Sequence, residues 1–148
     1  MKLSDEVIIP VPRQKVWEAL NDPEVLRQAI PGCEEVAKTS DTEMEAKVTV
    51  KMGPVKATFK GKVKLSDLDP PNGYRISGEG KSMMGGATGG ANVRLEDVPE
   101  GTKLIYDVDA QVTGKIASLA QRFIEPTARQ LSAQFFETFA KVAGGQGA

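Results

Sequence analysis

The stretch from Lys115 to Val142 constrains the fold of this chain more than any other part of the sequence. Its apolar residues recur at helical spacing, at Ile116, Leu119, Ala120, Phe123, Ile124, Ala128, Leu131, Phe135, Phe139 and Val142. This periodicity predicts an amphipathic helix with one broad apolar face, kinked at Pro126 or divided there into two abutting helices. Almost everything before it has strand character, so we expect the apolar face to pack against a sheet.

Two short helices are predicted near the amino terminus, after a first strand at residues 6–11. Pro12 is well placed as the first residue of one helix. Asp22 is a good cap for the next helix, and Pro23 suits its first position. We expect residues 7–30 to close one end of the molecule.

From Cys33 to Val112, apolar residues alternate with polar ones, which is typical of half-buried antiparallel strands. The alternating segments are residues 33–39, 44–52, 55–65, 74–80, 91–95 and 104–112. The order of elements predicts a single α+β domain at residues 1–143, in which a curved antiparallel sheet of about seven strands wraps around the long helix. Residues 144–148 are rich in glycine and are predicted to form a flexible tail.

The composition excludes several classes of function. The 148 residues contain no histidine and one cysteine, Cys33, which excludes a His-containing zinc site, a catalytic triad with histidine and an intrachain disulfide. The net charge of −1 provides no general attraction for nucleic acid. The amino terminus lacks the apolar run of a signal peptide, and no stretch approaches the ~20 apolar residues of a membrane span, so we expect a cytoplasmic protein.

The predicted inward face of the sheet carries many small residues. By strand parity these are Ala46, Ala57, Gly61, Gly78, Gly80, Ala91 and Ala110. Glycine weakens a strand interior, so either the sheet bends at these positions or the small residues leave space for a ligand. Their spread over at least four strands favours an apolar cavity between helix and sheet. The run from Lys81 to Gly90 is interpreted as a mobile, methionine-containing loop near its mouth, or as an ordinary loose hairpin.

A run of lysines marks the segment between residues 47 and 64. Its members are Lys47, Lys51, Lys56, Lys60, Lys62 and Lys64, with no acid among them. On the strand at residues 55–65 these lysines take the outward parity. This surface is either a solvated face of the sheet or a binding surface for an anionic headgroup or an acidic partner.

Several longer motifs stand out along the chain. They are Val16–Leu26 (VWEALNDPEVL), Ile30–Glu34 (IPGCE), Met52–Lys56 (MGPVK), Gly61–Val63 with Asp69–Pro71, Tyr106–Ala117 (YDVDAQVTGKIA) and Phe135-Phe136. Together these motifs resemble the CoxG family of carbon monoxide dehydrogenase subunits. The resemblance covers residues 2–142. It implies the START-like (SRPBCC) helix-grip fold, with a seven-stranded curved antiparallel sheet around a long C-terminal helix and two short helices after the first strand.

The resemblance also implies a setting for the protein. Members of the family are associated with attaching molybdenum carbon monoxide dehydrogenases or related hydroxylases to the inner face of the cytoplasmic membrane. Superfamily relatives bind lipids, sterols or quinones, and some are cyclases or hydrolases. Longer members continue into a linker and a hydrophobic tail; this sequence ends at Ala148, so autonomous anchoring of that kind is not expected of residues 1–148.

We therefore expect a non-enzymatic protein that binds a hydrophobic small molecule, a respiratory quinone or a lipid, and serves a membrane-associated molybdenum dehydrogenase. The expected lining residues are Val50, Met52, Phe59, Tyr74, Gly78, Met83, Met84, Ala91, Tyr106, Leu119, Phe123 and Phe135. Tyr74 or Tyr106 can hydrogen-bond a quinone carbonyl. No covalent cofactor, metal site or nucleic-acid partner is expected. The alternatives are a pure adaptor that recruits the dehydrogenase without a ligand, and a cyclase or hydrolase, which the lack of inward acids and bases disfavours.

Overall fold

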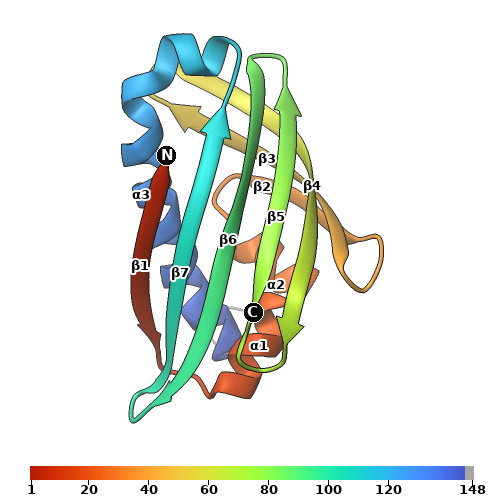
Figure 1. Ribbon diagram of the computed structural model, residues 1–148, viewed down its shortest axis with the longest axis vertical. Coiled ribbons are helices and arrows are strands. Elements are labelled where there is room, and N and C mark those ends of the chain that lie inside the picture. The colour runs from red at the N-terminus through yellow and green to blue at the C-terminus, as the bar shows by residue number, and fades with distance from the viewer. Residues whose placement is uncertain (146–148) are drawn as a thin grey trace.

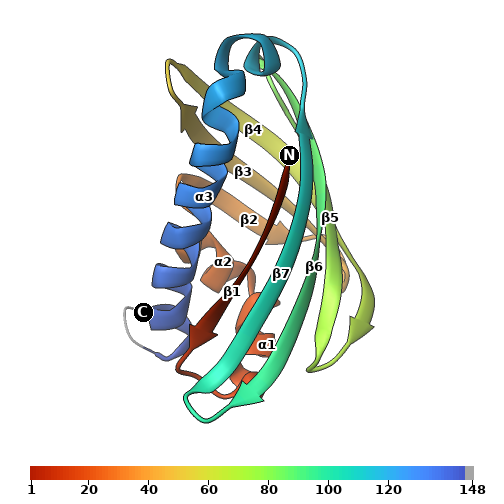
Figure 2. The ribbon, with the colours of Figure 1, turned by 60° about the vertical axis from the view of Figure 1, so that its left-hand side comes forward.

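A curved antiparallel sheet and one long helix make up most of the structure, a computed structural model that describes residues 1–145. The strands are β1 (Lys2–Ile9), β2 (Cys33–Lys38), β3 (Glu43–Met52), β4 (Val55–Asp69), β5 (Gly73–Ser82), β6 (Gly85–Val98) and β7 (Gly101–Val112). The helices are α1 (Arg13–Leu20), α2 (Pro23–Ala29) and α3 (Lys115–Ala143). The strand order is β1-β7-β6-β5-β4-β3-β2, and α3 runs along the concave face (Figures 1 and 2). The predicted fold class is confirmed. Of the predicted tail, residues 146–148 lie outside the described residues.

The second short helix follows the predicted local rules, whereas Pro12 takes the N-cap position of α1 rather than the predicted first helical position. Asp22 caps α2, because its carboxylate accepts the backbone N–H of Glu24 at 2.9 Å, and Pro23 occupies the first helical turn. The strand predicted at residues 6–11 is observed earlier, at Lys2–Ile9, because its whole length pairs with β7. Polar residues are tolerated in its first half, since β1 is an edge strand.

The segment at residues 81–90 is not the mobile loop that its glycines suggest. It forms a tight hairpin in which Ser82 pairs with Gly85, and only Met83 and Met84 lie between the strands. The Ser82 hydroxyl donates to the Gly85 carbonyl at 2.7 Å and accepts the Met84 N–H at 3.1 Å. Gly85 has φ of 128°, a conformation that favours glycine, and a Cβ there would collide with the Thr113 carbonyl. Of the two predicted alternatives, the mobile loop is therefore wrong and the hairpin is observed, because these glycines serve close approach of the backbone rather than flexibility.

Helix α3 is continuous through Pro126, so of the two predicted alternatives, a kink or two abutting helices, the second is wrong. Figures 1 and 2 show the helix bent in its amino-terminal half. Proline removes the N–H that would bond to the carbonyl of Arg122. Because Arg122 and Pro126 are both exposed, water can satisfy that carbonyl and the helix is able to continue.

Side chains between α3 and the sheet gather in two separate buried clusters. The larger lies toward α1 and α2, and its members include Leu3, Ile9, Val16, Leu20, Met44, Leu65, Tyr74, Leu95, Leu104, Tyr106 and Phe139. The smaller lies where α3 begins and contains Met52, Val55, Ala57, Ile116 and Ala120. Between the two clusters, the inward face of the sheet carries mainly small residues, and that region is the candidate site.

Candidate ligand cavity

The inward residues between the two core clusters lie side by side across neighbouring strands. One row is formed by Ala46, Gly61, Gly80 and Ala87, on β3, β4, β5 and β6. The next row contains Gly78, Gly89 and Ala110, on β5, β6 and β7. Together with Ala91, these small residues form the floor of an apolar cavity of about 390 Å³.

Larger apolar side chains form the walls of this cavity. Val48 and Phe59 stand on the side of the smaller cluster, and Val63, Ile76 and Val108 stand on the side of the larger one. A second apolar cavity, of about 190 Å³, adjoins the first, because both are lined by Ala46, Val63 and Ile76. Tyr74, Tyr106, Phe135 and Phe136 line this second space. The volume of the first cavity, about 390 Å³, lies within the roughly 300–1,000 Å³ that is typical of pockets for small-molecule ligands.

The glycines of the floor have different structural causes. A Cβ on Gly61 would lie 2.8 Å from the Glu79 carbonyl oxygen, and one on Gly89 would lie 2.9 Å from that of Asp109, so the neighbouring backbone requires glycine at both. At Gly80 the nearest atom is the Phe59 Cβ at 3.5 Å, an ordinary contact. Close approach of the neighbouring strand therefore explains Gly61 and Gly89, whereas Gly80 leaves space that a side chain would fit.

Two tyrosines mark the end of the cavity nearest the larger cluster. The ring of Tyr74 meets that of Trp17 edge to face, with centroids 5.5 Å apart, and burial raises the pKa of its hydroxyl well above the usual value. Tyr106 stacks on Phe136 at 5.2 Å. Burial raises the pKa of Tyr106 too, and the nearby Asp5 carboxylate adds to the shift. Both hydroxyls are neutral at physiological pH, and the hydroxyl of Tyr106 lies within hydrogen-bonding reach of Ser132.

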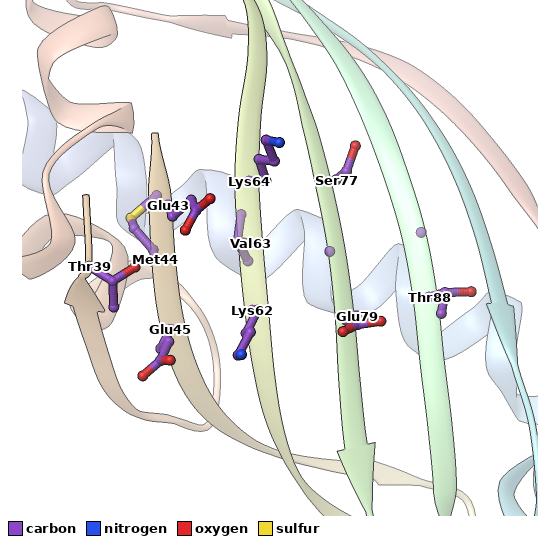
Figure 3. Close-up of a pocket in the computed structure, with 12 residues that line it drawn as sticks. Thr39, Glu43, Met44, Glu45, Lys62, Val63, Lys64, Ser77, Glu79 and Thr88 are labelled. Atoms are coloured by element: carbon purple, nitrogen blue, oxygen red, sulfur yellow. The ribbon is translucent and has the colours of Figure 1, made fainter. Parts of the chain in front are cut away.

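A larger hollow, of about 610 Å³, lies on the opposite face of the sheet. Figure 3 shows its charged side chains on β3, β4 and β5, with α3 behind the strands. Lys62 lies opposite both Glu45 and Glu79 in the strand register, and Lys64 lies opposite Glu43. Because its lysines and glutamates face each other across the strands and are exposed, we interpret this hollow as the solvated outer face of the sheet rather than as a site for an apolar ligand.

Within residues 1–145, no group of three or more His, Cys, Asp or Glu side chains is placed to hold a metal ion. No helix in the same range has the length and hydropathy needed to cross a bilayer.

The sequence matches the family model of CoxG, the G-subunit of carbon monoxide dehydrogenase, over residues 6–144. The chain belongs to the CoxG family. No curated protein matches the sequence. A helix-grip fold such as that of this CoxG-family protein is typical of proteins that bind hydrophobic ligands.

Solved structures share the fold of the CoxG-family protein at low sequence identity. A conserved protein from Geobacillus kaustophilus matches with a TM-score of 0.90 and 23% identity, over 98% of this chain and 96% of that one. Ara h 8.0201 matches with a TM-score of 0.68 and 16% identity, over 99% of each chain. The Zhui aromatase/cyclase from Streptomyces sp. R1128 matches with a TM-score of 0.67 and 15% identity, over 97% of this chain and 93% of that one.

The CoxG-family structure brings most of the predicted lining residues to the space between α3 and the sheet. Those that line the two cavities are Phe59, Gly78, Ala91, Tyr74, Tyr106 and Phe135. Those that belong to the adjoining smaller cluster are Val50, Met52, Met84 and Phe123. This second group lies beyond Phe59, so its members support the cavity wall rather than form it.

Two predicted lining residues lie outside the cavity. Met83 is fully exposed at the β5–β6 turn, and Leu119 is 57% exposed on the surface of α3. Sequence reasoning also missed Ala87 and Gly89, because residues 81–90 were assigned to a loop. Extending the alternation of Ala91 and Val93 back by two steps along the strand would have placed both on the inward face.

The predicted lysine run is divided by the structure. Lys51, Lys56, Lys60, Lys62 and Lys64 are exposed, whereas Lys47 is half-buried and pairs with Glu34 at 3.4 Å. Lys62 and Lys64 face acids across the strands of the outer hollow, as described above. Lys51 and Lys56 instead lie opposite each other, and Lys60 lies opposite both Lys47 and Lys81.

Proposed function

We propose that this CoxG-family protein binds a hydrophobic small molecule, a respiratory quinone or a lipid, between α3 and the sheet, without catalysing a reaction. In this proposal it serves a membrane-associated molybdenum carbon monoxide dehydrogenase or related hydroxylase, as a peripheral protein at the inner face of the cytoplasmic membrane. The observation that carries the proposal is the apolar space of about 390 Å³ that separates two well-packed core clusters. A protein that needed only to fold would close such a space with larger side chains.

The chemistry of the cavity matches an elongated apolar ligand with a weakly polar end. Contact with the floor and walls removes apolar surface from water, which contributes about 25 cal/mol per Å². The neutral hydroxyl of Tyr74 or Tyr106 is suited to donate a hydrogen bond to a carbonyl at the ligand's polar end. A quinone carries such carbonyls, and its apolar chain would extend along the glycine and alanine floor.

Two features favour this function over the alternatives. A pure adaptor needs no interior space and would be expected to have a solid core. An enzyme of the cyclase or hydrolase kind needs an acid or base in the cavity, and the inward residues of β3–β7 that line it are apolar or, like Tyr74 and Tyr106, held neutral by burial.

A pair of alanine substitutions tests the proposal. Ala91 lines the open cavity, whereas Ala57 is 3% exposed within the smaller cluster. We expect Ala91→Leu to preserve thermal stability and abolish binding of a short-chain naphthoquinone. We expect Ala57→Leu to cost roughly 1–3 kcal/mol of stability through overpacking, with binding retained. Gly80→Leu provides a second filling variant, because a Cβ fits there.

Binding is measured by quenching of Trp17 fluorescence and by calorimetry. Trp17 is the single tryptophan of the sequence, and its ring contacts that of Tyr74 at the cavity wall. Absence of naphthoquinone and lipid binding by the parent protein in both measurements would refute the proposal. So would strong destabilisation by Ala91→Leu and Gly80→Leu, since it would show that the interior is already filled.

A further inference from the structure

The end of the molecule where α3 begins carries a surface that the cavity does not explain. Figures 1 and 2 show the β3–β4 turn, the β5–β6 turn and the β7–α3 connection together at this end, far from α1. The N–H of Ile116 donates to the Met84 carbonyl at 2.9 Å. The ring of Phe123 lies against Gly53 of the β3–β4 turn. These contacts tie the three connections and the first turns of α3 into one surface.

Large apolar side chains protrude from this surface into water. Met83 is fully exposed at the tip of the β5–β6 hairpin, and Leu119 is 57% exposed on α3, three residues after Ile116. The Met83 side chain does not contribute to packing among residues 1–145, because it is fully exposed. Single exposed apolar residues are common on protein surfaces, so the charges around these two decide what the surface can bind.

The same surface has only one sign of charge. Its three segments, residues 49–60, 80–90 and 111–124, contain no Asp or Glu. Their cations, all exposed, are Lys51, Lys56, Lys60, Lys81, Lys115 and Arg122. In the strand register Lys51 lies opposite Lys56, and Lys60 lies opposite Lys81. Like charges directly opposite each other destabilise a sheet, so this arrangement does not serve the fold. We call these six cations, together with Met83 and Leu119, the basic cap.

We propose that the basic cap docks on the surface of an anionic lipid bilayer. Lysine and arginine place their charges among lipid phosphates while their aliphatic stems lie in the apolar region, and the exposed Met83 and Leu119 enter the acyl boundary. A protein partner would need a recess shaped to receive a protruding hairpin tip, whereas a bilayer accepts it without one. This inference rests on the proposed function for the membrane setting and deepens it by naming the surface that meets the lipid. A cap docked on lipid also brings the smaller cluster, and behind it the cavity, close to a membrane-soluble molecule.

Two double substitutions with equal change of charge test the cap. Lys51→Gln with Lys56→Gln removes two cap cations, and Lys62→Gln with Lys64→Gln removes two from the outer hollow, where each lies opposite a glutamate. Cosedimentation uses vesicles of phosphatidylglycerol mixed equally with phosphatidylcholine, and vesicles of phosphatidylcholine alone, at low salt. We expect the cap variant to partition on the order of 25-fold more weakly to the anionic vesicles, since each basic residue near such a surface contributes roughly a factor of five. The control variant should bind like the parent, because its lysines are not in the cap.

The depth of the cap is tested with a tryptophan at its tip. Met83→Trp should show a blue-shifted fluorescence spectrum with anionic vesicles, whereas Leu68→Trp, at the far end of β4 and also exposed, should not. The proposal is overturned if the parent binds neither kind of vesicle, if the two double variants bind equally, or if both tryptophans shift alike. These readouts need no ligand, and naphthoquinone binding is measured without vesicles, so failure of the cap and failure of the cavity are told apart.

Discussion

Tyr74 and Tyr106 place polar hydroxyl groups in an otherwise apolar interior. Each phenol ring packs against another aromatic ring, and burial raises the pKa of each hydroxyl. A neutral phenol can donate a hydrogen bond without the cost of burying a charge. This property allows a polar contact with a ligand in a cavity that is otherwise made of hydrocarbon.

The raised tyrosine pKa values predict a loss of stability in alkali. Tyrosine in an unfolded chain ionises at about pH 10, while in the folded protein the same hydroxyls keep their protons to higher pH. The unfolded state therefore binds fewer protons above that pH, and the free energy of unfolding should fall as the pH rises beyond it. The phenolate absorbance of Tyr74, obtained as the difference between the parent and Tyr74→Phe and followed beside circular dichroism, should rise only as the protein unfolds. Full ionisation of both tyrosines at the ordinary pKa in the folded protein would contradict their burial, and Tyr74→Phe identifies the contribution of Tyr74.

At the residue scale, strand parity predicted much of the cavity floor but not why each glycine is there. The alternation of polar and apolar residues placed Gly61, Gly78, Gly80 and Ala91 on the inward face, and the structure agrees. The sequence could not separate glycines that permit close strands from glycines that leave space. That distinction depends on distances between backbones, such as 2.8 Å from a Cβ on Gly61 to the neighbouring carbonyl oxygen, which no local pattern encodes.

Among the elements, α3 contributes to both core clusters and therefore joins the two ends of the sheet. Ile116 and Ala120 complete the smaller cluster, and Phe139 lies in the larger one, each with no exposed surface. Phe135 and Phe136 extend from the same helix to the cavity wall. The sheet alone would leave its concave face open to water.

Truncation after Gly114 is expected to abolish folding. It removes Ile116 and Phe139, which are fully buried, and the half-buried Phe123, Phe135 and Phe136. Burial of such side chains contributes roughly 1.5–3 kcal/mol each, so their sum reaches the roughly 5–15 kcal/mol that stabilises a typical domain. Scanning calorimetry should show no cooperative transition for the truncated chain. A transition like that of the parent would show that the sheet folds without α3.

The prediction of elements was incomplete at residues 81–90, where the glycines were interpreted without the strand residues that pair with them. The run at residues 81–90 contains four glycines, and its flexibility was inferred from composition alone. In the structure Lys81 pairs with Gly86, and Ser82 pairs with Gly85, so the run continues two strands to a short turn. The helices were easier to predict, because their signals, such as Asp22 with Pro23, are local.

For the whole molecule, the separation of the two core clusters predicts that a ligand stabilises the fold. A molecule that binds the native cavity and not the unfolded chain adds about 2.7 kcal/mol at a hundredfold excess over its Kd. We expect the melting temperature of the parent to rise with naphthoquinone concentration and that of Ala91→Leu to stay constant. Equal shifts in both proteins would place the binding outside the cavity.

The overall architecture could be predicted because each part of the sequence agrees with the rest. The period-2 segments, the turn residues between them and the long amphipathic stretch before Val142 all require a sheet that packs on one helix. The sequence only suggested where the cavity lies, because its position depends on the gap between the two core clusters. Met83 and Leu119 show the limit, because an apolar residue suits either a lining or an exposed surface and the sequence does not distinguish them.

The strand order also sets a sequence of events during synthesis. β1 is made first, yet it pairs with β7, so that Leu3 lies beside Val108. The ribosome must therefore complete the meander from β2 to β7 before the first strand has a partner, at roughly 5–20 residues per second. Until then the apolar side chains of β1, such as Leu3 and Ile9, remain available to chaperones. Joining the two ends of the chain is thus a late step of assembly, and it coincides with the emergence of α3.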